Sequence, residues 1–451
     1  MLELFLTIIV VAGAVMLIKR KHDPKVIMFL SGILLMFMAI LLGKSLLSVD
    51  ETTGIAIFDV FKVSTNVFYK QLTGASFILM LLFGYTAYMN EIKATDVTID
   101  LLSKPLKKAK SPTAILLGLF IIGNLLCIII PSASSLSVLM MSTLFPVFVR
   151  AGISPMAVIA IIATSATIAP TPLGADNIVA AQSLGISVTD YVFNYHAKIS
   201  IPALFAMGLA HIVWSRYLDK KEGLLKVEKL SETETVSSDQ RPIIYGVLPL
   251  LPLLFMVYFG VFNKEASVGI TEVTFFALVI AVMFEVIRTQ SLNQISKNLT
   301  VFFEGMGRGF TSVVAQVVSA MIFVEGLKLI GVITLLSDYV STIEGAGVLL
   351  VFVFCALAIG IGLLSGSGLA TFYAFVEIMP NFAMAANISP ILLAIPMQFV
   401  SHFVKSVSPV SPTVIITSSM SGVTPFKVIK RTIVPVLVAT IVTLVLSFIL
   451  L

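Results

Sequence analysis

The sequence predicts an all-α polytopic membrane protein made of two inverted-topology repeats. Three observations predict it. The chain of 451 residues is 58% hydrophobic and only 12% charged, its mean hydropathy is +1.06, and its Pro, Gly and Ser residues repeat an ordered pattern in the second half. So much apolar surface cannot be buried inside a soluble fold. A membrane β-barrel is excluded because the apolar runs are long and uniform, whereas barrel strands are short and alternating.

The apolar runs are long enough to cross a bilayer core, which requires about 20 apolar residues. Segment 2–18 is expected to remain as a span, because basic residues follow it, whereas a signal peptide begins with them. Each half is expected to have five spans and one re-entrant hairpin. The expected spans are 2–18, 26–47, 75–89, 153–184 and 199–217 in the first half, and 243–262, 273–287, 310–336, 388–420 and 432–451 in the second.

The repeat is visible as Pro, Gly and Ser residues that recur in the same order at a spacing of about 235 residues. Such internal similarity is typical of duplicated folds. The residues between the third and last spans carry the match. We therefore predict a first repeat at 1–217, a polar cytoplasmic linker at 218–242 and a second repeat at 243–451. The matching segments are 132–136 with 365–369, 145–155 with 379–390, 171–172 with 408–409, and 185–187 with 422–424.

The distribution of Lys and Arg predicts the topology, because cytoplasmic loops carry an excess of both. We expect segments 113–149 and 348–386 to be the re-entrant hairpins. This arrangement places most of the 29 basic residues on the side of the linker, whereas loop 337–347 on the opposite side has none. The bias predicts an inverted second half, both termini outside and a location in the bacterial cytoplasmic (inner) membrane.

Carriers with inverted repeats bind their cargo near the membrane midplane, where interrupted helices direct their N-termini at anions. Four segments rich in small residues have this character: the hairpin tips 131–137 and 365–371, and the helix breaks 164–177 and 405–413. Hydroxyl groups both donate and accept hydrogen bonds in little volume, although small residues also serve close helix packing. The candidate substrate-binding residues are Ser132, Ser134, Ser135, Thr171, Asn177, Ser365, Ser367, Gly368, Thr371, Lys405, Ser408 and Ser411.

Ionisable residues inside a membrane are candidates for function because their burial is costly. Lys405 is the candidate cation for a substrate carboxylate, and its alternative is to extend to the interface. His402 either assists it or is a hydrogen-bonded packing residue. Asp176 and Asn177 follow the first break and either coordinate a coupling cation or cap the half-helix that begins there. Glu377 is the candidate carrier of coupled protons.

The remaining expectations concern ions and partners. No cofactor is expected, and the coupling ion is Na⁺, with Ser134 and Ser367 as candidate ligands, or H⁺. Glu325 and Lys328 are three apart in one span and are expected to neutralise each other. The net charge of +5 is spread over loops, so nucleic-acid binding is not indicated. Membrane lipid and a small carboxylate are the expected partners.

Six stretches carry a resemblance to a known family over nearly the whole chain. The chain resembles the anaerobic C4-dicarboxylate carriers of the Dcu type C family, within the ion transporter superfamily. Residues 402–405 (His-Phe-Val-Lys) differ from the Asn-Leu-Gly-Arg stretch of the family, and Pro131 replaces a small polar residue. The stretches are 103–106 (Ser-Lys-Pro-Leu), 143–147 (Thr-Leu-Phe-Pro-Val), 214–222 (Trp-Ser-Arg-Tyr-Leu-Asp-Lys-Lys-Glu), 366–368 (Gly-Ser-Gly), 372–377 (Phe-Tyr-Ala-Phe-Val-Glu) and 408–411 (Ser-Pro-Val-Ser).

The resemblance implies exchange or ion-coupled uptake of fumarate, succinate, malate or aspartate. It also implies an elevator-type homodimer, with scaffold parts 1–112 and 243–346 and transport parts 113–217 and 347–451. The alternatives are a carrier of another small carboxylate anion, a passive channel, and an intramembrane serine hydrolase. In the hydrolase, Ser367 would be the nucleophile and His402 the base, but no partner acid is apparent.

Overall fold

A computed structural model describes residues 2–20, 22–107, 111–130, 132–150, 152–222, 241–259, 263, 266 and 268–451. All regular secondary structure in these ranges is helical. Within them, eight helices are long and apolar enough to cross a membrane, or nine if one bent pair counts as a single span. The expectation of an all-helical polytopic membrane protein is therefore confirmed. Pro131 and residues 223–240 of the expected linker lie outside the described ranges.

The helices of the first half begin where the sequence favours a first turn. Proline opens three of them, α2, α6 and α8, because its fixed φ suits this position and its missing N–H has no intrahelical partner there. Helices α3 and α4 form a pair bent by 50°. The elements are α1 (Leu2–Lys19), α2 (Pro24–Leu41), α3 (Ala56–Leu72), α4 (Ala75–Glu91), α5 (Ala94–Lys107), α6 (Pro112–Ile129), α7 (Ala133–Arg150), α8 (Pro155–Thr164), α9 (Ala175–Ser183), α10 (Val188–Asp190), the π-helical turn η1 (Tyr191–His196) and α11 (Ala197–Glu222).

The second half follows a similar order of elements. Its expected span 310–336 is wrong at its end, because Gly331 adopts a φ of +87° and turns the chain into a separate helix. The elements are η2 (Ile243–Leu250), α12 (Leu251–Val257), α13 (Ile270–Thr289), α14 (Leu292–Gly309), η4 (Phe310–Val314), α15 (Ala315–Leu329), α16 (Val332–Ser341), α17 (Ala346–Ser365), α18 (Gly368–Phe375), η5 (Val376–Ile378), α19 (Met379–Ala385), α20 (Pro390–Val404), α21 (Pro412–Ser421) and α22 (Pro425–Leu450).

The linker begins later than the predicted residue 218, since α11 continues to Glu222. The extra turn is held by Arg431 of α22, whose guanidinium is 1% exposed and forms ion pairs with Asp219 and Glu222, each at 2.5 Å. Asp219 also accepts a hydrogen bond from Ser154 Oγ at 2.9 Å. A buried, doubly paired Arg fixes this helix end because an unpaired charge there would be strongly destabilising.

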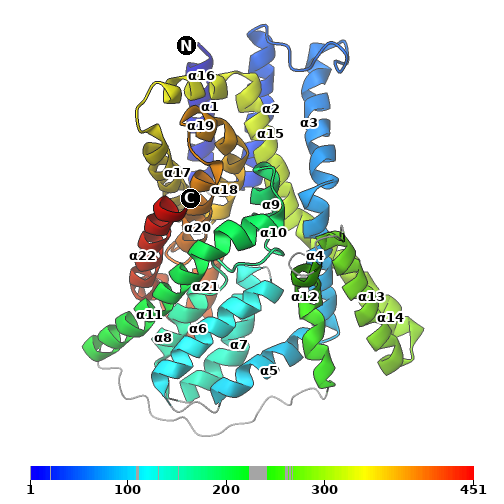
Figure 1. Cartoon of the computed structure of the whole chain (residues 1–451), viewed down its shortest axis with the longest axis vertical. Helices are drawn as coiled ribbons and strands as arrows, with labels where there is room; N and C mark the ends of the chain where they lie inside the picture. The colour runs from blue at the N-terminus through cyan, green and yellow to red at the C-terminus, as the bar shows by residue number, and fades with distance from the viewer. Residues whose placement is uncertain are drawn as a thin grey trace.

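The two halves interlock along their length. Helix α2 packs along α15, α4 along α14 and α11 along α22. The α2–α15 contact is close enough that a Cβ on Gly326 would lie 2.6 Å from the carbonyl oxygen of Gly32, which explains the small residues at this crossing. In Figure 1, α5, α6 and α7 lie in the lower part of the molecule and α16, α18 and α19 in the upper part, with α9 between them.

Candidate functional site

The two predicted helix breaks are present, and they meet. Helix α8 ends at Thr164 and α9 begins at Ala175, while α20 ends at Val404 and α21 begins at Pro412. Within the first break, Ala166 adopts a φ of +60°, a left-handed conformation that is unusual without glycine. Its carbonyl oxygen accepts a hydrogen bond from Lys405 Nζ. Lys405 therefore crosses from the break of the second half to that of the first.

Lys405 belongs to a chain of polar side chains that runs through His402 to Asp176. Lys405 Nζ lies 3.2 Å from His402 Nδ1, and His402 Nε2 lies 2.7 Å from Asp176 Oδ2. A lysine ammonium can only donate, so His402 Nδ1 is the acceptor and the neutral ring carries its proton on Nε2. The ring then donates to Asp176. The site is thus a linear array of a cation, a neutral imidazole and a carboxylate.

Like His402, Gln398 binds the carboxylate oxygen Oδ2 of Asp176. Its Nε2 donates to Asp176 Oδ2 at 2.5 Å and to Asn177 Oδ1 at 2.7 Å, and its Oε1 accepts from the hydroxyl of Tyr191. Asn177 Nδ2 donates in turn to the carbonyl oxygen of Thr171 at 2.8 Å. The predicted residues Asp176 and Asn177 are therefore joined by the fully buried side chain of Gln398 from the second half, and Asn177 in turn holds Thr171.

The capping alternative for Asp176 is wrong. The residue before α9 is Gly174, and no side chain caps this helix end. Asp176 is the second residue of α9, and its carboxylate is taken up by Gln398 and His402 instead. The carboxylate thus belongs to the polar network between the two halves.

The second hairpin tip packs directly on the second break. Gly366 ends α17 with a φ of +75°, and a Cβ there would lie 2.7 Å from the carbonyl oxygen of Val410. A Cβ on Gly368 would overlap the backbone of Ser401. Ser408 Oγ donates to the carbonyl oxygen of Leu363 at 2.9 Å. Only glycine allows this approach of backbone to backbone, so the Gly-Ser-Gly stretch is required by the contact.

Four buried hydroxyl groups around the second tip and the breaks have no hydrogen-bond partner among the described residues. Thr167 lies in the first break, Ser411 in the second, Ser401 in α20 and Thr371 in α18. Buried polar groups in folded proteins are almost always satisfied, so each exception needs an explanation. Their position at the meeting point of the two halves makes them candidate ligand contacts. Thr371 and Ser411 were predicted; Thr167 and Ser401 were not.

The first tip is organised differently. Ser135 donates from its backbone N and its Oγ to Ser132 Oγ, at 3.3 and 3.0 Å. Ser134 is half-buried beside them. In the described part of the chain, no hydrogen bond joins these three serines to Ser367 or to the other residues of the second tip. The contact of the first hairpin with the second half is made by its outgoing arm, because α7 packs against α21.

Two further acidic residues have defined partners. Glu377 Oε1, in η5, accepts from Ser183 Oγ at 2.5 Å, which ties the arm of the second hairpin to the end of α9. Its role as a proton carrier stays a prediction. Glu325 and Lys328 form an ion pair at 3.7 Å, so the expected neutralisation is confirmed.

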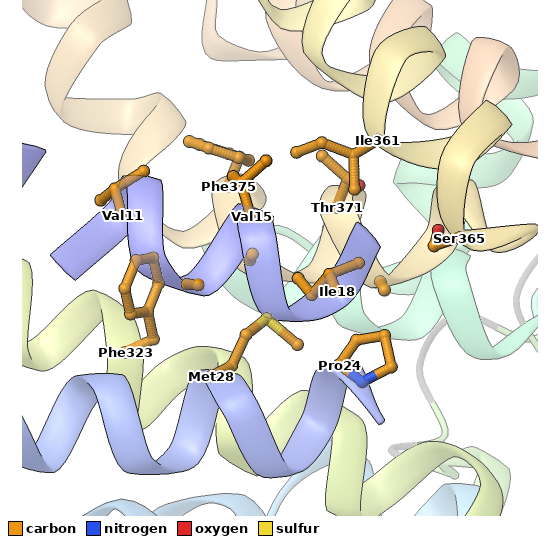
Figure 2. A pocket seen from close by; sticks show the side chains of 13 residues that line it. Val11, Val15, Ile18, Pro24, Met28, Phe323, Ile361, Ser365, Thr371 and Phe375 are labelled. Atoms are coloured by element: carbon orange, nitrogen blue, oxygen red, sulfur yellow. The ribbon is translucent and has the colours of Figure 1, made fainter. Parts of the chain in front are cut away.

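Ser365 and Thr371 also border a cavity of about 80 Å³ between the second hairpin and the N-terminal helices. Figure 2 shows both residues on the side of the hairpin and Val15, Ile18 and Met28 on the opposite side. The rest of the lining is apolar, from α1, α2, α15, α17 and α18. The hairpin therefore contacts the N-terminal helices across an interface that is not completely filled.

Sequence reasoning missed Gln398 and Tyr191 and gave His402 a minor part. A signal for the first was available, because Gln398, His402 and Lys405 have the i, i+4, i+7 spacing that places side chains on one face of a helix. Three polar residues in that register within an apolar span indicate a buried polar face. Tyr191 and the carbonyl group of Ala166 had no comparable signal.

A family model and a curated relative agree on one family. The family model for DcuC, the C4-dicarboxylate anaerobic carrier, matches residues 2–451. The anaerobic C4-dicarboxylate transporter DcuC of Escherichia coli K12 is 33% identical over 446 residues, covering 98% of this chain and 96% of that protein. Among solved structures, the YdaH transporter of Alcanivorax borkumensis has a TM-score of 0.67 at 14% identity, covering 95% of this chain and 98% of that one. MtrF of Neisseria gonorrhoeae has a TM-score of 0.52 at 12% identity, covering 95% of each chain. The last two likenesses concern the fold.

Proposed function

This chain belongs to the DcuC family of C4-dicarboxylate anaerobic carriers, and from that premise we propose that it binds fumarate, succinate, malate or aspartate where its two helix breaks meet. It is a transporter of the bacterial inner membrane with several spans and not an enzyme. The proposed activity is exchange of dicarboxylates or their uptake coupled to Na⁺ or H⁺. A different small carboxylate anion is the alternative cargo.

The observation that carries the proposal is the position of Lys405. Its ammonium has three donors, of which one meets the carbonyl group of Ala166 and one meets His402. The third is available to a substrate carboxylate. A dicarboxylate in a partly dehydrated site needs such a compensating charge, because an unpaired ion is very costly to bury.

The second carboxylate of the substrate would meet the helix ends and hydroxyl groups of the same region. Helix α21 begins beside Ser411 and α18 beside Ser367, and the first turn of a helix presents free backbone N–H groups and a partial positive charge. The unpartnered hydroxyls of Thr167, Ser401 and Ser411 supply further donors. Ser134 and Ser367 remain the proposed Na⁺ ligands.

The proposed transport mechanism is of the elevator type, in a homodimer with two inverted repeats. The parallel order of elements in the two halves supports the repeat. The position of α6 and α7 in the lower part of the molecule and of α18 and α19 in the upper part supports hairpins that enter from opposite sides (Figure 1). The cavity between the second hairpin and α1 and α2 (Figure 2) supports movement of 113–217 and 347–451 against 1–112 and 243–346.

The hydrolase alternative finds no support in the geometry. Both ring nitrogens of His402 are engaged, one by Asp176 and one by Lys405. A general base for Ser367 needs a ring nitrogen that accepts the hydroxyl proton. Here the only accepting nitrogen of the neutral ring faces an ammonium group, so no nucleophile–base pair is formed.

Transport in proteoliposomes tests the proposal. Purified protein is reconstituted, and uptake of labelled succinate is measured with Na⁺ gradients, pH gradients and internal fumarate varied one at a time. We expect saturable uptake that internal fumarate accelerates and that excess malate inhibits, whereas acetate does not. Absence of uptake under every gradient, with correctly inserted and folded protein, would refute the assignment of C4-dicarboxylates.

A further inference from the structure

The charges of the central array are balanced only while the site is empty. Lys405 contributes one positive charge and Asp176 one negative charge, and the hydrogen-bond pattern requires His402 to be neutral. A bound dianion would add two negative charges to this balanced set. Such an excess is expensive in the membrane interior, where water cannot solvate it. One cation that enters with the substrate would halve this excess.

We infer that this cation is a proton and that His402 Nδ1 receives it when the dicarboxylate binds. The inference rests on the proposed function, since it names the coupling ion and its residue. His402 touches Lys405 and Asp176 rather than the substrate. It is a positioning residue that acts through Lys405.

The proposed step is the transfer of a proton from the acid form of the buffer, which becomes its conjugate base, to the lone pair of Nδ1. The Nε2–H bond to Asp176 is kept, and the new imidazolium forms an ion pair with that carboxylate. An imidazolium has no acceptor nitrogen, so the hydrogen bond from Lys405 to Nδ1 is lost. The ammonium of Lys405 then lies beside the positive charge of the His402 imidazolium and is repelled by it. It turns toward the substrate carboxylate with two donors free instead of one.

Other titratable groups lie near the array, and none has the same two partners. His196 packs on Phe399 with ring centroids 4.5 Å apart and lies near Asp176 and His402, but no hydrogen bond joins it to either among the described residues. Cys127 is near Lys405, and Tyr373 is near Asp176. Among the residues that the structure describes, only His402 connects the cation and the carboxylate directly. Protonation at this ring alone both adds charge and releases Lys405.

The experiment counts protons on binding. Fumarate binding to the purified full-length chain is measured by calorimetry in two buffers of different ionisation enthalpy, at about pH 7 and about pH 8, where fumarate remains a dianion. We expect uptake approaching one proton per fumarate and an affinity that falls by about tenfold per pH unit. His402→Gln keeps one donor and one acceptor but cannot take a proton, so its binding should be weaker, release or absorb no protons, and be independent of pH.

Two control variants locate the proton. His211 is an equally buried histidine that bonds only to Thr164, at 2.8 Å, and His211→Gln should retain the uptake. Glu377→Gln removes the other predicted proton carrier, and this variant retains the uptake if His402 receives the proton. Zero uptake by the parent protein overturns the inference even if His402→Gln does not fold, and so does uptake that survives in His402→Gln or disappears in Glu377→Gln. Folded parent protein that binds no fumarate at either pH refutes the proposed function itself.

Discussion

Two carboxylates of this protein, the fully buried Glu285 and the half-buried Asp176, are surrounded in different ways. Glu285 is fully buried and is saturated, because it accepts from the Tyr245 hydroxyl at 2.7 Å, from Arg288 Nε and an Nη, both at 2.8 Å, and from Asn298 Nδ2 at 3.3 Å. All four of these donors bind the same carboxylate group. They join η2, α13 and α14 into one rigid corner.

Asp176 accepts from Gln398 and His402, but its network does not end there. It continues through His402 to Lys405, which retains an unused donor, and it is bordered by hydroxyl groups without partners. Unsatisfied polar groups in a buried place are destabilising, so a cluster of them is maintained for a reason other than folding. Unpartnered hydroxyl groups alone do not mark the binding site, because the buried hydroxyl of Tyr88 near Glu285 also has no partner among the described residues. The unused donor of Lys405 is the feature that distinguishes the region of Asp176 from that of Glu285.

The largest expected effect is on substrate affinity and comes from Lys405→Ala. Removing one partner of a buried charge pair costs about 3 to 5 kcal/mol, so succinate affinity should fall by more than about a hundredfold. Calorimetry on the detergent-purified variant measures it. Lys405→Arg should retain part of the affinity, because it keeps the charge while changing the geometry of the donors.

Lys328→Ala is the matched control for this change, since Lys328 also lies in a span but pairs with Glu325. Its affinity should equal that of the parent. If Lys405→Ala binds succinate within about threefold of the parent, a change of only about 0.7 kcal/mol, Lys405 belongs with the structural residues and the comparison fails at its centre.

Glu285→Ala is expected to lower the free energy of unfolding by about as much as Lys405→Ala lowers the free energy of binding. Its affinity for succinate should not change. The substitution leaves Arg288 and Asn298 without their shared acceptor, so the free energy of unfolding should fall by about 3 kcal/mol. Denaturation in mixed micelles measures the loss, and calorimetry should give unchanged succinate affinity. Glu304→Ala is the control, because its pair with Arg308 is more than half exposed at 3.9 Å and should contribute less than about 1 kcal/mol. An affinity change in Glu285→Ala would connect this corner to the site.

The sequence was sufficient for the helices, the breaks and the presence of Lys405, because proline, glycine and charge in long apolar runs have local consequences. The helix breaks at 165–174 and 405–411 were both predicted from such residues. The sequence was not sufficient to predict which groups these residues contact. Whether Lys405 meets a carbonyl group more than two hundred residues away depends on how two halves cross, and no local pattern encodes that distance.

The hydroxyl residues show the same limit more sharply. Ser408 and Ser411 were predicted as equivalent substrate ligands, since they share one Ser-Pro-Val-Ser stretch. The structure separates them, because Ser408 Oγ is bonded to the carbonyl group of Leu363 and Ser411 Oγ has no partner. Composition identifies a hydroxyl group but does not tell whether its hydrogen bond is already made.

The smallest expected effects come from Ser408 and Ser411. One substitution should change stability, and the other should change affinity. Ser408→Ala removes a hydrogen bond of the second tip, so the free energy of unfolding should fall by about 1 kcal/mol while affinity changes little. Ser411→Ala removes a hydroxyl that has no partner without substrate, so stability should be kept or slightly raised. Its succinate affinity should fall by about fivefold, which corresponds to one lost hydrogen bond of about 1 kcal/mol. Both variants are measured side by side by denaturation and calorimetry. The two residues are compared because only Ser408 has already made its hydrogen bond. If both substitutions change stability and succinate affinity equally, unused hydrogen-bonding capacity does not distinguish the binding site from the scaffold in this protein.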